Sequence, residues 1–337
     1  MNYISIGDMA QQFQLRQHNV QLKSTLNQLT KEVVSGEHSD VARALRGDLT
    51  ALSGIDRSMK MIAAYEVVNA EAGLAADAMQ TVLETMRTSA DDTGATLLSA
   101  ATTASAAMIE TATGDAAVKF SSLVASLNAN IGGRYLFGGA ATDSAPLPPA
   151  SEMLAQIETA ISGITVASDI ISAVDDWFDA PAGTTGYRND TYRGSEAPAG
   201  PFNIADGERL EIGVNATSPE VRDMLKGFAL AALLGGGLAD GDEAGRSILT
   251  QAAGERIVTG EGKLAGLQGK VGTIQGQIET ARTRNSAESS ALERARDKLV
   301  SIDPYESATA LEAAKGQLET LYTLTSRLSG LSLVDYI

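Results

Sequence analysis

Apolar residues near the start of the chain recur at the spacing of a helix. Leu15, Leu22 and Leu29 follow one another at seven-residue intervals, and Leu26 and Val33 fill the alternate positions. This spacing places all five residues on one face of an α-helix. A glycine at position 36 then interrupts the pattern, so we expect one amphipathic helix within residues 1–40.

A second helical part is expected over residues 41–145. Amphipathic patterns run over residues 41–87 and 95–131, and the chain has no proline before Pro146. The stretch is rich in Ala, Leu, Met and Glu, a composition that favours long helices over sheet. Gly94 and Gly114 are predicted weak points within it.

The most regular pattern lies in the last third of the chain. From Leu264 onwards the first and fourth positions of six consecutive heptads are mainly apolar, with polar residues such as Asn285 at the centre. We expect a continuous helix from near Asp242 to Ile302, about 90 Å long at 1.5 Å per residue. It forms most of a second helical segment, residues 242–303.

A last apolar stripe follows in residues 304–337. Pro304 is expected to end the preceding helix. The new stripe has alternating spacings of three and four residues. Each terminal helix can bury its stripe only by pairing with the other terminal helix or with neighbouring molecules. We therefore take both ends as the candidate assembly surface, formed by Leu15, Leu22, Leu26, Leu29, Val33, Leu311, Leu318, Leu321, Leu328, Leu331 and Leu333.

The middle of the chain, residues 146–241, differs in composition. It holds seven of the eight prolines, which indicates a separate inserted domain. Alternating residues around Asp206-Gly207 predict a β-hairpin, and Ser218-Pro219 predicts the start of a helix that ends at Gly235. The expected fold is therefore mainly α: a long coiled-coil-like helical bundle from both chain ends, with a small inserted α+β domain.

Composition narrows the classes of function. The formal charge is −16, which disfavours nucleic acid as a partner. The sequence has no stretch of 18 apolar residues, which is the length needed to span a membrane. Its N-terminus lacks the pattern of a secretory signal. Cysteine is absent and the two histidines, His18 and His38, are isolated. We therefore expect no catalytic residue, no cofactor and no metal site.

One group of residues in the insert is a candidate ligand site. Tyr187, Arg188, Tyr192 and Arg193 lie close together in the sequence and could hold an anionic ligand. Exposed strand residues are the favoured explanation of this group.

Several segments resemble those of a known family. They are Ser35-Gly36, VNAEAG at 68–73, GRYLFGG at 133–139, SATAL at 307–311 and LSLVDYI at 331–337. With them the chain resembles the flagellin and hook-associated protein 3 superfamily of bacterial flagella. The GRYLFGG segment and the C-terminal tail resemble the hook-associated branch in particular, since flagellins of the filament shaft usually end differently.

The resemblance implies a fold and a function. It implies that both termini pair as helices lining an inner tube, with middle helices around them and the insert facing outward. It also implies export through the flagellar type III channel without signal cleavage, and hence an extracellular location in the flagellum.

The implied function is structural. The subunits would form a ring at the hook–filament junction, with a junction protein on the hook side, flagellin on the filament side and an export chaperone before secretion. The alternatives are a filament flagellin that polymerises alone, an unrelated helical scaffold or signalling module, and an enzyme hosted in the insert.

Overall fold

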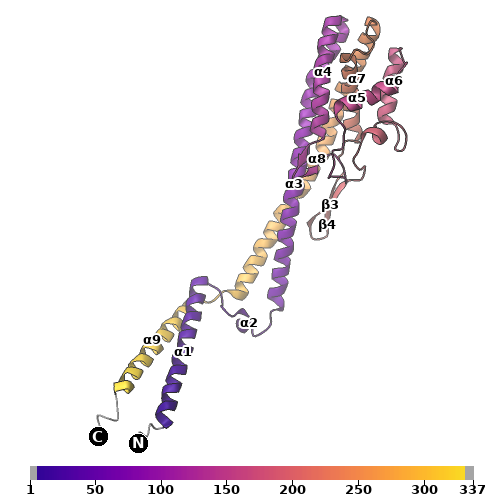
Figure 1. The fold of residues 1–337 in the computed structure, drawn as a ribbon. Coiled ribbons are helices and arrows are strands. Elements are labelled where there is room, and N and C mark those ends of the chain that lie inside the picture. The colour runs from indigo at the N-terminus through magenta and orange to yellow at the C-terminus, as the bar shows by residue number, and fades with distance from the viewer. Residues whose placement is uncertain (1–5, 331–337) are drawn as a thin grey trace, which may run out of the picture. The chain divides into compact units, whose positions relative to one another are not determined.

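The computed structural model describes residues 6–330, with side chains for residue 10 and residues 13–327, and these residues are mainly α-helical (Figure 1). The helices are α1 (Ile6–Ser35), α2 (Val41–Ala44), α3 (Thr50–Thr103), α4 (Ala106–Leu127), α5 (Ala150–Ala160), α6 (Ala167–Asp179), α7 (Pro219–Gly235), α8 (Glu243–Val300) and α9 (Pro304–Gly330). The strands are β1 (Asn130–Ile131), β2 (Arg134–Tyr135), β3 (Ala199–Ala205) and β4 (Glu208–Ile212), and η1 (Tyr187–Thr191) is a π-helical turn. The expected fold class, mainly α with a small α+β insert, is confirmed.

The chain divides into two compact units. The terminal unit comprises Met1–Met61 and Ala287–Ile337, and the bundle unit comprises Ile62–Ser286. Helices α3 and α8 each contribute residues to both units. The terminal unit is therefore built from the two ends of the chain, which are far apart in the sequence.

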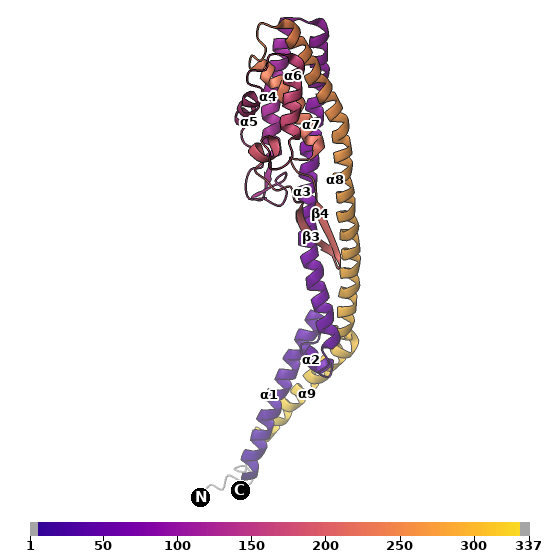
Figure 2. The same ribbon diagram turned by 90° about the vertical axis from the view of Figure 1, so that its right-hand side faces the viewer.

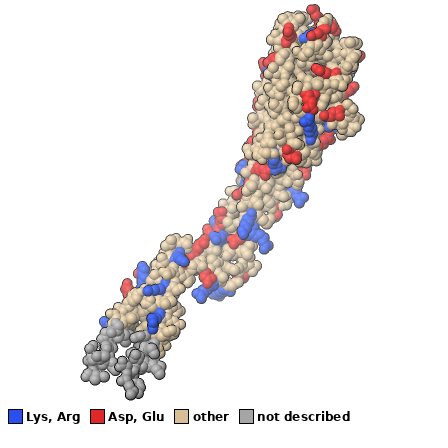
Figure 3. Space-filling model, viewed as in Figure 1, with Lys and Arg blue, Asp and Glu red and all other residues tan. Residues whose placement is uncertain are grey.

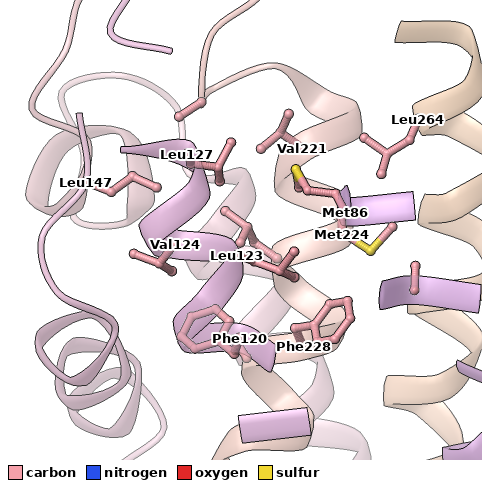
Figure 4. Packing of buried hydrophobic residues seen from close by; sticks show 14 of the residues in the cluster. Met86, Phe120, Leu123, Val124, Leu127, Leu147, Val221, Met224, Phe228 and Leu264 are labelled. Carbon is pink, nitrogen blue, oxygen red and sulfur yellow. The ribbon is translucent and has the colours of Figure 1, made fainter. Parts of the chain in front are cut away.

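The core of the bundle unit lies where α3, α4, α7 and α8 pack together. Figure 4 shows Phe120 of α4 and Phe228 of α7 close together, with Met86 of α3 and Leu264 of α8 nearby, and all four are fully buried. Burying one such side chain contributes about 1.5–3 kcal/mol. These few large residues form a bulky core within a chain that is otherwise rich in alanine.

The predicted weak points at Gly94 and Gly114 are wrong. Both glycines lie inside continuous helices, and the break falls at Ala104, which has a φ of 48°. Gly94 serves close packing instead, because a Cβ atom there would lie 2.8 Å from Cγ2 of Val258 in α8. A glycine in a helix can therefore mark a helix contact as well as a helix end.

The structure also corrects the role of Pro304. The long helix α8 already ends at Val300, and Pro304 is the first residue of α9. Oδ1 of Asp303 accepts hydrogen bonds from the amides of Tyr305, at 2.9 Å, and Glu306, at 3.1 Å. Proline suits this place, since the first helical position needs no amide donor.

The insert contains the expected hairpin and helix. Strands β3 and β4 pair antiparallel, with Ala205 opposite Glu208 across the turn at Asp206-Gly207. Helix α7 has the predicted bounds, Pro219–Gly235. The expectation of an exposed strand around residues 187–193 is wrong.

Aromatic packing gives the reason for this difference. Tyr187 is fully buried in η1, where its ring stacks on Phe178 with the ring centroids 5.3 Å apart. Its hydroxyl donates to the carbonyl oxygen of Ala216 at 2.8 Å. Burial raises the pKa of the Tyr187 phenol well above its ordinary value, so this hydroxyl stays protonated and keeps its hydrogen bond.

Candidate assembly surface

Helices α1 and α9 pack against each other within the terminal unit, and they lie side by side in both ribbon views (Figures 1 and 2). Each buries its apolar stripe against the other. The half-buried members are Leu15, Leu22, Leu26, Leu29, Leu311 and Leu318, and the buried ones are Ala314 and Leu321. The two ends of the chain thus supply each other's partner.

The other predicted assembly residues are not among these buried and half-buried positions. Val33 also lies on α1, but it is 39% exposed. Leu328 lies in α9, but its side chain is outside the described part, and Leu331 and Leu333 lie outside the described residues.

Two chain turns at one end of the helix pair are joined by backbone hydrogen bonds. The amide of His38 donates to the carbonyl oxygen of Val300 at 2.9 Å, and the amide of Ile302 donates to that of Gly36 at 3.0 Å. The guanidinium of Arg296 adds an ion pair with Glu37 at 3.1 Å. These contacts fix the turn that follows α1 against the turn that precedes α9.

Glu32 stabilises the same turn from the last part of α1. Its Oε1 atom accepts hydrogen bonds from the amide of Ser39 at 3.1 Å, the hydroxyl of Ser39 at 2.8 Å and Nε2 of Gln28 at 3.0 Å. Burial alone would raise the pKa of this carboxyl, but the hydrogen bonds from Gln28 and Ser39 outweigh burial and lower it. Glu32 is therefore an ionised, buried anchor of the turn after α1.

A second apolar row lies on the outward face of α1 and was missed by the sequence reasoning. We call Phe13, Val20 and Val34 the outward row; their side chains are 64%, 69% and 82% exposed. They keep the seven-residue spacing, with Asn27 at the intervening position. The row is offset from the Leu15 stripe by two residues, about 200° around the helix. The same heptad spacing that identified the inward stripe could have found it.

The outward row is apolar surface on a helix whose inward face already has a partner. Around it lie Arg16, Lys23 and Lys31, all exposed. The ammonium of Lys23 stands 5.8 Å from the ring centroid of Tyr322 on α9, a distance at which a cation and an aromatic ring attract each other. This face therefore combines apolar and basic groups.

Two segments that carry the family resemblance meet in the bundle unit. Glu71, from VNAEAG, forms an ion pair with Arg134, from GRYLFGG. Asn69, also from VNAEAG, donates from Nδ2 to the carbonyl oxygen of Ile204 in β3. The two segments, more than 60 residues apart in sequence, thus form one local arrangement of α3, β2 and β3.

The two arginines of the group at residues 187–193 lie near acidic side chains. Arg188 lies 3.6 Å from a carboxylate oxygen of Glu196, and Arg193 lies 2.7 Å from one of Glu152. Figure 3 shows acidic side chains gathered over the insert and the neighbouring end of the bundle unit on the viewed face. An anionic ligand would have to displace these carboxylates, which weakens the alternative of an anion site there.

In the part of the chain that the structure describes, His, Asp and Glu residues form no group of three or more that could hold a metal ion. No helix of that part has the length and hydropathy needed to cross a bilayer.

The fold defines a mainly helical protein in which α1 and α9, the first and last described helices, form one pair. Residues 259–337, which include most of α8 and all of α9, match the model of the bacterial flagellin C-terminal helical region. These residues therefore form a flagellin-type C-terminal region, which agrees with the expected resemblance to the flagellin superfamily and supports a structural role in a bacterial flagellum.

The crystal structure of Bacillus cereus FlgL is similar over 71% of this chain and 96% of that chain, with 15% sequence identity and a TM-score of 0.49. A comparison with curated proteins gave no match.

Proposed function

We propose that this chain is a structural subunit of the junction between hook and filament in a bacterial flagellum. The flagellin-type region at residues 259–337 supports the flagellar role. The GRYLFGG segment and the LSLVDYI tail support the junction within that role, because they resemble the hook-associated branch. The proposed function involves no catalytic step.

The observation that best supports assembly with other subunits is the exposed outward row on α1. The inward leucines of α1 are covered by α9, whereas Phe13, Val20 and Val34 remain open to solvent. An exposed apolar row at heptad spacing is typical of a helix that packs against another helix. In the proposed mechanism the inward stripes join α1 to α9 while the outward row packs against a neighbouring subunit.

The terminal unit buries little apolar surface, and for this reason we expect its folding to be coupled to association. Two helices that share one seam bury little apolar surface for the backbone entropy they lose on ordering. Contacts with neighbouring subunits supply further burial and stabilise the pair. The subunit would thus order its ends when it joins the assembly.

The proposal includes partners and a route. The chain would form a ring with copies of itself, contact a junction protein on the hook side and flagellin on the filament side, and bind an export chaperone before secretion. It would leave the cell through the flagellum's own export channel and act outside the cell. A filament flagellin is the second candidate, because it would share the C-terminal region and the paired ends.

The two candidates differ in what the purified chain does alone. We would incubate it by itself, with hook fragments and with filament fragments, and follow light scattering and negative-stain images. A junction subunit stays soluble alone and adds to fragment ends. Long filaments from the chain alone would replace the junction proposal by the flagellin one, and indifference to all fragments would contradict both.

A further inference from the structure

A small apolar pocket opens in the bundle unit, away from the helix pair of the termini. Its volume is about 190 Å³, and it lies between α3, the β1–β2 turn and the β3–β4 hairpin. Apolar side chains form its walls, among them Leu74, Met79, Ile131, Leu136, Phe202 and Ile212.

The charged residues of the pocket neutralise each other. Among the described residues that line it, Glu71 and Arg134 are the charged ones, and they form an ion pair between α3 and β2. Their side chains are about half exposed, at 47% and 49%, so the pair stands at the solvent side. An apolar interior offers water few hydrogen bonds, and such cavities stay dry or take apolar guests.

The walls are held in place by hydrogen bonds. The amide of Tyr135 donates to the carbonyl oxygen of Thr142 at 2.8 Å, and the amide of Leu136 donates to that of Ala129 at 3.1 Å. Gly132 and Gly133 have φ values of 59° and 85°, which favour glycine, in the tight turn between β1 and β2. The GRYLFGG segment thus builds one side of the pocket.

We propose that this pocket binds a small uncharged aromatic or aliphatic molecule. Its volume exceeds that of the engineered cavity of about 150 Å³ that binds benzene, so a guest of about six to ten non-hydrogen atoms fits. An aromatic guest packs against the ring of Phe202, and this contact favours aromatic over polar guests. A charged guest is disfavoured because the walls cannot pair its charge.

Indole is a suitable probe, and methyl NMR of the full chain is a direct readout. Met79 lines the pocket, whereas Met108, 44% exposed on α4, lies outside it. The expected result is a saturable shift of the Met79 methyl signal during an indole titration, with no saturable shift at Met108. The absence of a saturable Met79 shift, or equal shifts at both methionines, would overturn the proposal.

Filling the pocket provides a second test. Ala75→Leu places extra volume in the wall, and Ala70→Leu is its control, an exposed residue of the same helix outside the pocket. Indole affinity should fall about tenfold or more in Ala75→Leu and stay unchanged in Ala70→Leu. Thr142→Leu fills the pocket from the opposite side and replaces Ala75→Leu if that variant does not fold. Unchanged indole affinity in a folded filled variant would overturn the assignment.

Discussion

The side-chain amides of Asn69 and Asn285 both donate to the same acceptor, the carbonyl oxygen of Ile204, each at 2.9 Å. Asn69 is on α3, Asn285 is on α8, and both are buried. The acceptor belongs to β3, so one backbone oxygen ties the hairpin to two long helices. The bidentate ion pair of Arg284 with Glu208 adds a link from α8 to β4.

This shared acceptor predicts a non-additive mutational effect. Asn285→Ala should cost about 1 kcal/mol, the typical net value of one hydrogen bond. Asn69→Ala should cost less, because it also removes a buried side-chain oxygen that has no partner. The double variant leaves the Ile204 carbonyl without both donors, so it should cost more than the two single losses together. Urea unfolding of the four proteins measures the cycle, and additivity within about 0.5 kcal/mol would contradict the account.

Close helix packing predicts opposite effects for two glycine substitutions. A Cβ atom on Gly227 would lie 2.6 Å from Cγ1 of Ile257 and 2.9 Å from its backbone nitrogen, whereas one on Gly114 would meet nothing within 4 Å. Gly114→Ala should stabilise the bundle unit by about 0.5–1 kcal/mol through its higher helix propensity. Gly227→Ala should destabilise it, since α7 must move away from α8. Thermal unfolding by circular dichroism checks both signs, and an equal gain in the two variants would refute close packing at Gly227.

Glu32 predicts a pH-dependent contribution to stability. Its pKa in the folded chain lies below the value of about 4.3 expected in the unfolded chain. The stabilisation from the ionised carboxylate is therefore fully present above that unfolded value and is lost as the pH falls through the lowered folded pKa. Glu32→Gln should lower the free energy of unfolding at pH 7 by about 1–3 kcal/mol, since hydrogen bonds to a charged acceptor weaken.

The difference between wild type and Glu32→Gln should shrink as the pH is lowered from about 4.3. Urea unfolding between pH 2 and pH 7 measures this difference. Glu66→Gln, at an exposed position of α3, controls for the change in net charge. A difference that is constant over the whole range would contradict an ionised anchor at Glu32.

The helix pair of the terminal unit predicts a local loss of structure. Leu22→Asp or Leu318→Asp puts a charge into the seam between α1 and α9. Burying a carboxylate in an apolar seam is unfavourable unless a charged or hydrogen-bonding partner compensates for the lost hydration. Both variants should lose protection against amide hydrogen exchange in α1 and α9 and keep it in α4 and α7. Loss of protection throughout the bundle unit would show that the two units do not fold independently.

The sequence could predict the elements whose signals are local. Heptad spacing identified both terminal helices and α8, and Asp206-Gly207 and Ser218-Pro219 identified the hairpin and the start of α7. These features follow from backbone geometry within a few residues. The sequence misled where tertiary packing decides the outcome, as at Gly94, which allows α8 to approach α3 closely.

The candidate site was predictable only in part. The leucine stripes gave the seam between α1 and α9, but a stripe does not tell whether its partner is in the same chain or in another. The outward row keeps a heptad spacing that the sequence contains, but its exposure, with the inward stripe packed on α9, is known only from the structure. The shared acceptor at Ile204 was also out of reach, because Asn69 lies 135 residues from it in the chain.

The central claim is that subunits assemble through the outward face of α1, and Val20→Asp tests it most directly. Val118→Asp on α4 is a matched control, because Val20 and Val118 are 69% and 67% exposed. We would measure addition of each variant to hook and filament fragments by sedimentation and negative-stain imaging. The account predicts that Val20→Asp keeps the helix content of the wild type but no longer joins fragment ends, while Val118→Asp joins them normally. Normal addition of Val20→Asp, or equal loss in both variants, would contradict it.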